Sequence, residues 1–504
     1  MSHPPIPPTP PTAPPQGPPG FGPTPYSGGP HGTQPPYGPI PPHFQQLPSA
    51  SGRPGRTGKR RAAVIAGCVT AALAVLAAGI LAFFHFNDGQ QSAADGKGGT
   101  SAKASPAAVS TQSRVLLNVP PPKEEIGDEG HRGDGSWVTP HSYVSGGPDA
   151  VLGYDLDSGK PTWTLPLDGN LCRASRDSTS KGYVAVVFAG SKKPWSKCTE
   201  VAVIDINRGR KVWQKSVPEA TRGLDLSVAI SEQFAAVGWS EDESWGFAVD
   251  TGKTAWDSPP PGCGYEEYLG GSTLAGLAFC DGHFAVSQRD PRTGQPSRTV
   301  KLPKDVGYPY LASADPLVVA SYVGDEYNQL DANRLWTFDT DGSVKATIKV
   351  GDYVPGCRSG TGTGCGAVVA TPDTLYLASD KEHIISGNHI AAFDISTGRL
   401  KWTVEGGGMA ELRPLRADKK GLIAYKNAGS AREGSGVLHL AAADGKETVL
   451  LEQPADFKIS NTAEQMSPER MTEPILYEDG RLFFHRNSGY FQDDIPMTYA
   501  LTIH

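Results

Sequence analysis

From about residue 114 to the end of the chain, apolar and polar residues alternate over short runs, and turns containing Gly and Asp separate these runs. Alternation with a period of two predicts half-buried β-strands, because successive side chains of a strand point to opposite faces. No convincing long amphipathic helix interrupts the pattern. We therefore predict an all-β domain over residues 114–504.

One apolar run upstream has a different character. Residues 62–86 are an almost uncharged stretch of 25 positions. A helix of that length spans about 37 Å, more than the roughly 30 Å hydrocarbon core of a bilayer. A cleaved signal peptide would be shorter and would not usually follow a long tail. Residues 65–68 are similar to a lipoprotein cleavage box, but only three residues separate them from the preceding basic cluster, so we predict an uncleaved transmembrane helix.

A repeated unit organises the β-rich region. In each copy an apolar strand ends in Asp, a Gly-containing turn follows, and the next strand carries Trp. The Asp side chain can cap backbone N–H groups of the turn, Gly supplies a positive φ, and Trp buries a large apolar surface between neighbouring units. The clearest copies contain Asp155 and Trp163, Asp205 and Trp213, Asp250 and Trp256, and Asp394 and Trp402; weaker copies contain Asp290, Asp339 and Asp444.

The spacing of these aspartates, 40 to 55 residues, is typical of propeller blades of four short strands each. The last segment of the chain ends one strand short of a complete blade. Residues 114–120 are an unassigned β-like run, and they would complete that blade and close the ring, which removes exposed strand edges. We therefore predict an eight-bladed β-propeller, with seven blades as the alternative.

The repeat resembles the tryptophan-docking repeat of the pyrroloquinoline-quinone-type propellers, most clearly at residues 154–163 and 393–402. The resemblance covers nearly all of residues 130–504. It implies the fold more strongly than the function, because that family includes quinone-dependent dehydrogenases, outer-membrane assembly scaffolds and other envelope proteins. In composition, the Pro-rich tail and single anchor are similar to envelope proteins of high-GC Gram-positive bacteria, that is, of actinobacterial type.

The segments around the predicted membrane helix indicate its orientation. Residues 1–61 contain twenty of the 45 prolines, no acidic residue and five basic residues, four of them within 56–61. The remaining residues hold 41 basic and 53 acidic side chains, a net charge of −12. The positive-inside rule places the N-terminus in the cytoplasm and the propeller outside the plasma membrane. The short basic cluster beside an apolar run does not indicate nucleic-acid binding.

Two segments have compositions typical of disorder. Residues 1–61 have too few apolar side chains to fold, so we expect a disordered cytoplasmic tail with polyproline II character. It serves either as a spacer or as a docking strip for an aromatic-lined groove of a cytoplasmic partner. Residues 87–113 are rich in Gly, Ala, Ser and Lys, and we expect a flexible linker between membrane and propeller.

The cysteines agree with an extracytoplasmic domain. Cys68 lies in the predicted membrane helix, and six others lie beyond it. An even set outside the membrane indicates disulfides. Six cysteines allow fifteen pairings, and pairing of neighbours is the simplest; the alternative, a metal site, lacks ligand spacing. The neighbouring candidates are Cys172 with Cys198, Cys263 with Cys280, and Cys357 with Cys365.

Motifs that would indicate a reaction are missing from the sequence. There is no metalloprotease, nucleophile-elbow or phosphate-loop motif, and no adjacent Cys pair or haem-attachment segment like those of several quinone-dependent dehydrogenases. We therefore assign no catalytic or metal-binding residue and no cofactor. We expect a non-catalytic binding or scaffold module of the cell envelope, for a protein, peptide or glycan partner. The alternative is an enzyme that uses the propeller funnel, either a dehydrogenase with pyrroloquinoline quinone and calcium or a glycan-acting enzyme.

Overall fold

The computed structural model describes residues 110–121, 131–193, 196–217, 226–239, 243–303, 306–323, 332–339, 341–357, 364–380, 386–428, 434–466, 475–489 and 494–504. None of the helices in these ranges has the length and apolar character needed to cross a bilayer. The predicted tail (1–61), transmembrane helix (62–86) and most of the linker (87–113) lie outside the described residues.

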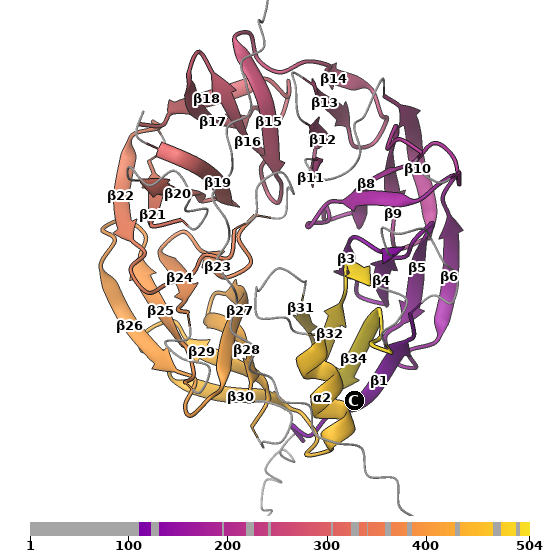
Figure 1. Ribbon diagram of the computed structural model, residues 1–504, viewed down its shortest axis with the longest axis vertical. Helices are drawn as coiled ribbons and strands as arrows, with labels where there is room; N and C mark the ends of the chain where they lie inside the picture. The colour runs from indigo at the N-terminus through magenta and orange to yellow at the C-terminus, as the bar shows by residue number, and fades with distance from the viewer. Residues whose placement is uncertain are drawn as a thin grey trace, which may run out of the picture. The chain divides into compact units, whose positions relative to one another are not determined.

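Eight four-stranded antiparallel sheets form a closed ring (Figure 1). Blade 1 contains β3 (Ser136–Val138), β4 (Ser142–Gly146), β5 (Ala150–Asp155) and β6 (Pro161–Pro166). Blade 2 contains β7 (Leu171–Ala174), β8 (Tyr183–Phe188), β9 (Glu200–Asp205) and β10 (Arg210–Ser216). Blade 3 contains β11 (Ser227–Ile230), β12 (Phe234–Trp239), β13 (Glu243–Ala248) and β14 (Thr254–Trp256). Blade 4 contains β15 (Cys263–Leu269), β16 (Ala275–Cys280), β17 (His283–Arg289) and β18 (Pro296–Lys301).

The second half of the ring repeats this plan. Blade 5 contains β19 (Val306–Ala314), β20 (Leu317–Val323), β21 (Arg334–Phe338) and β22 (Val344–Lys349). Blade 6 contains β23 (Val368–Ala370), β24 (Thr374–Ala378), β25 (His389–Asp394) and β26 (Leu400–Glu405). Blade 7 contains β27 (Glu411–Asp418), β28 (Gly421–Asn427), β29 (Gly436–Ala441) and β30 (Glu447–Glu452). Blade 8 contains β31 (Ile475–Glu478), β32 (Arg481–His485), β34 (Thr498–Thr502) and β1 (Arg114–Val119).

The ring is closed by strands from opposite ends of the described chain. β1 is the outer strand of blade 8 and pairs with β34, from Arg114 beside Thr502 to Val119 beside Thr498. This confirms the prediction of eight blades and the role given to residues 114–120. A second, two-stranded sheet of β2 (His131–Arg132) and β33 (Ser488–Gly489) supports the closure. The propeller begins slightly before the predicted boundary, because residues 111–113 hydrogen-bond to Glu452 at the end of β30.

The Trp of one blade packs on the turn of the next. Trp163 lies against Gly209, Trp213 against Gly252, Trp256 against Gly294 and Trp402 against Gly445. A β-carbon added at any of these four glycines would lie only 2.4–2.9 Å from a Trp ring atom. Two of the indole N–H groups also donate to the next blade, Trp213 to the Val249 carbonyl at 2.7 Å and Trp402 to the Ala442 carbonyl at 3.0 Å. The repeat therefore joins blades as well as defining them.

The repeat aspartates do not all occupy the same place. Asp155 and Asp394 end their strands and accept turn N–H groups, from Ser158 and Thr397 at 2.8 Å each. In blade 3, however, β13 ends at Ala248, whose N–H bonds to the Lys253 carbonyl as that of Asp394 bonds to Arg399. Asp250 therefore differs from the prediction: it lies inside the turn and forms a 2.8 Å ion pair with Lys181 of blade 2.

Asp205 and Asp444 also depart from the simple pattern. The Asp205 side chain is fully buried and pairs with Arg208 at 2.9 Å, so its carboxylate is held by a guanidinium of its own turn. In blade 7 the strand-ending place belongs to Ala441, whose N–H donates to the Lys446 carbonyl. Asp444 lies three residues later, within the turn.

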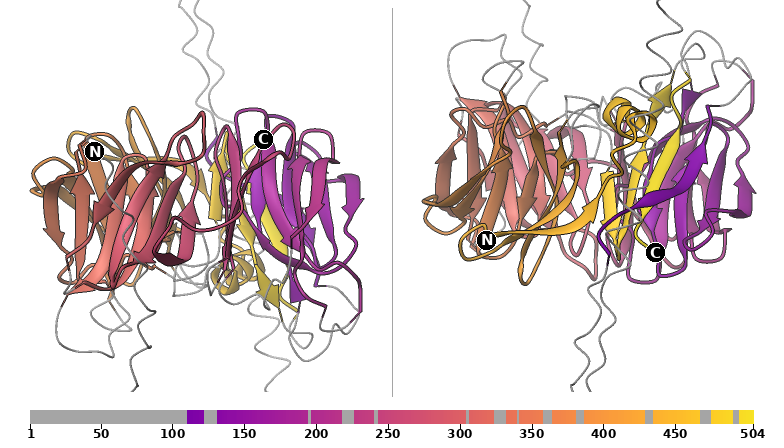
Figure 2. Two further views of the ribbon diagram at one scale, coloured as in Figure 1. Left: turned by 90° about the horizontal axis from the view of Figure 1, so that it is seen from above. Right: turned by 90° about the horizontal axis from the view of Figure 1, so that it is seen from below.

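The ring has two unlike faces, seen edge-on in Figure 2. On one face the chain passes from the second to the third strand of a blade, and from the fourth strand to the next blade. We call this the loop face, because it carries connections such as 189–199, 350–367, 453–474 and 486–497; the third includes helix α2 (Phe457–Gln465). The opposite turn face carries short connections such as 206–209, 371–373, 419–420 and 479–480.

Candidate functional site

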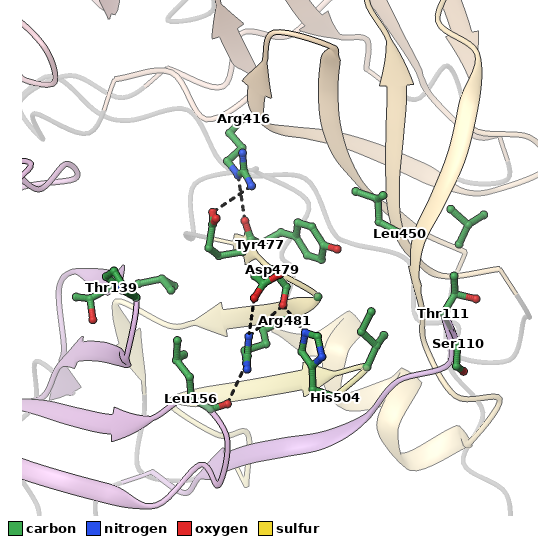
Figure 3. A pocket seen from close by; sticks show the side chains of 16 residues that line it. Ser110, Thr111, Thr139, Leu156, Arg416, Leu450, Tyr477, Asp479, Arg481 and His504 are labelled. Atoms are coloured by element: carbon green, nitrogen blue, oxygen red, sulfur yellow. Dashed lines mark hydrogen bonds and ion pairs between the residues drawn. The ribbon is translucent and has the colours of Figure 1, made fainter. Parts of the chain in front are cut away.

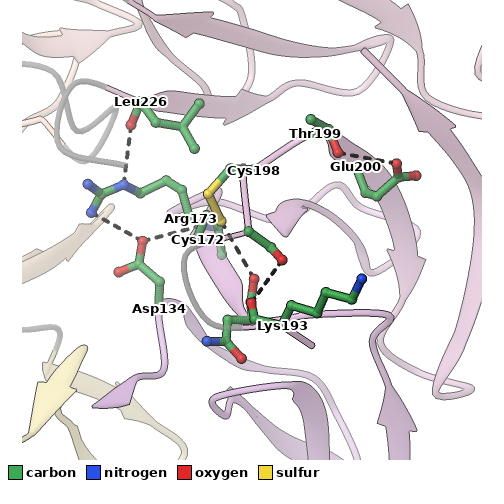
Figure 4. Close-up of a disulfide and its surroundings, with 11 residues drawn as sticks. Asp134, Cys172, Arg173, Lys193, Cys198, Thr199, Glu200 and Leu226 are labelled. Atoms are coloured by element: carbon green, nitrogen blue, oxygen red, sulfur yellow. Dashed lines mark hydrogen bonds and ion pairs between the residues drawn. A yellow bond between two sulfur atoms is a disulfide. The ribbon is translucent and has the colours of Figure 1, made fainter. Parts of the chain in front are cut away.

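All three disulfides lie on the loop face. Cys172–Cys198 joins inner strand β7 to the connection 189–199 (Figure 4). Cys263–Cys280 links β15 to β16 at their loop-face ends. Cys357–Cys365 closes part of the connection 350–367. The structure therefore contains the three neighbouring pairs that the sequence favoured, and two of them fix long connections, 189–199 and 350–367.

A buried ion pair lies beside the first disulfide (Figure 4). The Arg173 guanidinium lies 3.3 Å from the Asp134 carboxylate, and both side chains are largely buried. Arg173 also donates to the Leu226 carbonyl at 3.2 Å, and the Ala174 N–H donates to Asp134 at 3.3 Å. This contact joins the residues that lead into blades 1 and 3 to the inner strand of blade 2. The Asp134 carboxylate is therefore committed within the ring.

The loop face also carries the two phenylalanines that are exposed in the described part of the chain. Phe279, near the end of β16, is 45% exposed and packs edge-on against Phe284 with ring centroids 5.1 Å apart. Phe457, the first residue of α2, is 67% exposed. The neighbouring Cys263–Cys280 disulfide fixes the strand that carries Phe279. Large exposed rings on a fixed backbone are typical of contact sites for another molecule.

Residues from distant blades meet inside the ring. Gly364, which precedes blade 6, lies so close to Arg176 of blade 2 that an added β-carbon would be 3.4 Å from the guanidinium. The same carbon would be 3.3 Å from the Leu311 carbonyl on inner strand β19. Asp177, next to Arg176, has its pKa raised by burial, an effect that the Arg176 charge partly opposes. The connection 350–367 thus extends from the loop face to the opposite side of the ring interior.

A cleft lies on the turn face between blades 7, 8 and 1 (Figure 3). Its volume is about 1030 Å³, and residues Ser110 and Thr111 border it. Its apolar walls come from all three blades: Val138, Leu156, Val449, Leu450 and Ile503.

The charged groups of this cleft are already paired. Arg416 lies 3.0 Å from Glu478 and donates to the Tyr477 carbonyl at 3.1 Å. Arg481 lies 2.8 Å from Asp157 of blade 1 and donates to the Leu156 carbonyl at 3.0 Å. Because both guanidinium groups have carboxylate partners within the chain, the cleft joins blades rather than presenting a set of uncompensated charges to a ligand.

Two hydroxyl–histidine pairs have the composition of a nucleophile and its base, but their surroundings indicate a structural role. Ser379 Oγ lies 3.0 Å from His389 Nδ1, and it also bonds to the Asp380 carbonyl and the His389 N–H. Thr498 Oγ1 lies 3.0 Å from His485 Nδ1. Both hydroxyl residues are at most 2% exposed, so a substrate cannot reach either oxygen in this conformation.

Metal-binding side chains do not gather in the described ranges: no three His, Cys, Asp or Glu residues there could hold one ion. The resemblance to quinone-dependent dehydrogenases implies a calcium ion held by carboxylate and amide groups. Among the described residues, no group of three carboxylates that could hold such an ion occurs. The repeat residues are likewise distributed around the ring, at the junctions between blades, and do not converge on one site.

The exposed phenylalanines and the Arg173–Asp134 ion pair were not predicted from the sequence. Phe279 and Phe457 have no local signal, because an exposed and a buried phenylalanine look alike within an alternating pattern. The contact of Arg173 with Asp134 joins residues of different blades, which sequence spacing alone does not bring together.

Comparisons with known proteins give one family match and a set of similar solved structures. Residues 93–264 match the sequence model of a family described as outer membrane protein assembly factor BamB. No curated protein matches the chain. Among solved structures, BamB from Moraxella catarrhalis has 13% identity and a TM-score of 0.43, over 73% of this chain and 95% of that one. Sqt1 from Saccharomyces cerevisiae has 12% identity and a TM-score of 0.43, over 78% and 98%.

A third similar structure is the quinohemoprotein alcohol dehydrogenase ADHIIG from Pseudomonas putida HK5, with 12% identity, a TM-score of 0.44, and coverage of 78% of this chain and 76% of that one. At these identities and scores the structures support no conclusion about function. The family match, the repeated Asp-turn-Trp unit and the closed ring of blades agree with one another. The chain is therefore an eight-bladed β-propeller whose repeats are similar to the pyrroloquinoline-quinone-like type.

Proposed function

We propose that this chain is a membrane-tethered, extracytoplasmic docking scaffold that binds an envelope protein, peptide or glycan through its loop face and catalyses no reaction. The observation that carries the proposal is the asymmetry between the two faces. All three disulfides, the long connections and both exposed phenylalanines lie on the loop face. Stabilising long connections on one side only is of use when that side must present a fixed surface.

The location outside the plasma membrane is part of the proposal. It is supported by the apolar run at residues 62–86, by the basic residues before it and by the disulfides after it. Disulfides persist in oxidising compartments and are rare in the cytosol. The Pro-rich residues 1–61 would then remain in the cytoplasm, where they are available to a second partner.

The scaffold role is supported by the family match over residues 93–264, since that family is described as an assembly factor. The ring itself favours binding over reaction, because its hydroxyl–histidine pairs are buried and its Arg416 and Arg481 groups are internally neutralised. We propose that the bound partner is another component of the envelope.

Site-specific photo-crosslinking in the native host tests this proposal. A crosslinking amino acid replaces Lys193 on the loop face in one variant and Lys419 on the turn face in the other; both are exposed lysines. We expect one discrete, reproducible adduct from position 193 and none of that mass from position 419. Adducts from the turn face alone, or no adduct from either face, would contradict the proposal.

The purified propeller domain, without the predicted tail and membrane helix, provides a second test, directed at the enzymatic alternative. Pyrroloquinoline quinone is added with calcium, and quinone fluorescence and dye reduction with alcohols are followed. We expect neither saturable binding nor dye reduction. Tight binding with alcohol-dependent reduction would replace the scaffold by a dehydrogenase.

A further inference from the structure

The seam that closes the ring contains a buried histidine. By the seam we mean β1, β2 and Gly133 on one side, and β32, β33 and β34 on the other. His485, the last residue of β32, is 1% exposed. Its Nε2 bonds to the Gly133 carbonyl, and its Nδ1 lies 3.0 Å from Thr498 Oγ1. One side chain thus connects the residues that enter blade 1 with the last strand of blade 8.

These contacts define the proton positions on the ring of His485. A carbonyl oxygen only accepts, so Nε2 carries the proton and donates it to Gly133. Nδ1 is then unprotonated and accepts from the Thr498 hydroxyl. The neutral imidazole therefore satisfies both contacts. A second proton on Nδ1 would force the Thr498 hydroxyl to turn and lose its acceptor.

The other charged and titratable groups near the seam do not compensate a charged imidazole. Asp134 lies one residue beyond Gly133, but its carboxylate already accepts from Arg173 and from the Ala174 N–H. Tyr143 on β4 is buried, and burial raises its pKa, so it stays neutral. The Arg486 guanidinium, next in the chain, bonds to the Ile495 carbonyl at 3.4 Å and adds positive charge.

The pKa of His485 is lowered, chiefly because burial disfavours the charged ring; the bond to Gly133 and the Asp134 charge oppose this effect without cancelling it. This lowered pKa makes closure of the seam depend on pH. A histidine whose pKa is lower in the closed seam than in the open seam stabilises closure above its ordinary pKa of about 6.5 and loses that contribution as the pH falls.

We propose that His485 makes closure of the ring sensitive to acid, so that its protonation opens the seam locally while the remaining blades stay folded. The seam is suited to such a step because β1 and β34, which close the ring within blade 8, come from opposite ends of the described chain and are joined only by non-covalent contacts. β1 and β2 are held to blade 8 by strand pairing, by the 2.9 Å bond from the Gly133 N–H to Asn487 and by side chains such as His485.

Hydrogen exchange measured by mass spectrometry tests this inference on the whole propeller domain. Exchange at pH 7.5 and pH 5.0 is corrected for the intrinsic chemical rate and compared between seam peptides (114–119 and 484–489) and blade 5 peptides (317–323). For each pKa unit by which closure lowers the pKa of His485, acid can raise the equilibrium constant for opening of the seam by up to about tenfold. We expect an increase of about threefold or more at the seam and no comparable change in blade 5.

Two variants make the test specific. His485→Gln offers an N–H to Gly133 and an oxygen to Thr498 but takes up no proton, so its seam should not respond to pH. His439→Gln, in blade 7, removes a histidine that lies 3.5 Å from Asp418, and it should behave like the wild type. An unchanged acid response in His485→Gln, or equal loss of protection in all blades, would overturn the inference.

If His485→Gln fails to fold, the inference can still be tested on the wild-type protein. The titration of the His485 ring is then followed by NMR through its carbon-bound protons. A ring that titrates at or above pH 6.5 would contradict the inference, and one that titrates only as seam protection is lost would support it. Neither result depends on the membrane tether or on the partner of the loop face, so the proposed function stands or fails separately.

Discussion

Tyr143 of blade 1 and Phe483 of blade 8 stack face to face, with ring centroids 4.5 Å apart and planes within 2°. Both residues are at most 1% exposed, and they lie between the first blade and the blade that contains both ends of the ring. A large aromatic contact therefore joins blade 1 to the C-terminal strands of blade 8, which reach β1 only by strand pairing. Such a pair contributes about 0.5–1.5 kcal/mol beyond the burial of its apolar area.

Replacing Phe483 by Ala should strongly destabilise the propeller. Removal of a buried phenylalanine ring leaves a cavity and costs about 3–5 kcal/mol of unfolding free energy. Denaturant unfolding with the disulfides intact measures this cost. Phe279→Ala is the matched control, because the ring it removes is 45% exposed, and its cost should stay below about 1.5 kcal/mol. Equal effects of the two variants would show that the stacked pair does not support closure.

The packing of Trp402 on Gly445 predicts a steric effect that can be separated from backbone strain. Gly445 has φ +72°, and an added β-carbon would lie 2.9 Å from Trp402 and 2.7 Å from Val404. Gly407 has φ +76° with open space around it. Gly407→Ala should therefore cost only the backbone term, about 1–2 kcal/mol. Gly445→Ala should cost clearly more in the same unfolding measurement, and an equal cost would exclude blade-to-blade packing as the reason for glycine.

The disulfides should contribute unequally to stability. Cys172–Cys198 spans 26 residues and Cys357–Cys365 spans 8. The loop-entropy relation gives about 3.5 kcal/mol for the longer loop and about 2.5 kcal/mol for the shorter one. Double Cys→Ala variants, compared by thermal unfolding, should follow this order. The reverse order would mean that contacts of the connection 350–367, rather than loop closure, determine the effect.

The turn of blade 6 predicts that acid lowers the stability of the propeller. Side-chain and backbone bonds from Ser396 and Thr397 lower the pKa of Asp394 to about 2. A carboxyl whose pKa is lower in the folded state stabilises that state above about pH 4, and the contribution disappears as the pH falls towards 2. Asp394→Asn should be less stable than the wild type at pH 6, and the two should converge near pH 2. A constant difference across this range would exclude the carboxylate as the cause.

Much of the fold could be predicted from the sequence because the relevant signals are local. The Asp-turn-Trp unit recurs at blade spacing, and the unpaired run at residues 114–120 matches the strand missing from the last blade. The position of Asp250 could not be predicted, since a turn with Asp two residues after the strand end looks the same in sequence as one that begins at Asp. Only the hydrogen bonds of Ala248 distinguish them.

The candidate site was less predictable, for a physical reason. The loop face is defined by the direction of every strand and by which connections therefore emerge together. Cys172 and Cys357 are nearly two hundred residues apart, yet both form their disulfides on the same face. His485 is similar, because nothing in its neighbourhood along the chain indicates that it bonds to Gly133.

The pairing of β1 with β34 also determines when the ring can close during synthesis of the chain. The strand that emerges first from the ribosome must wait for one made nearly four hundred residues later before its hydrogen bonds can form. Until then the growing ring has an open edge at each end, and such edges readily pair with other chains. Synthesis of this propeller should therefore depend on assistance that protects the incomplete ring until β34 has been made.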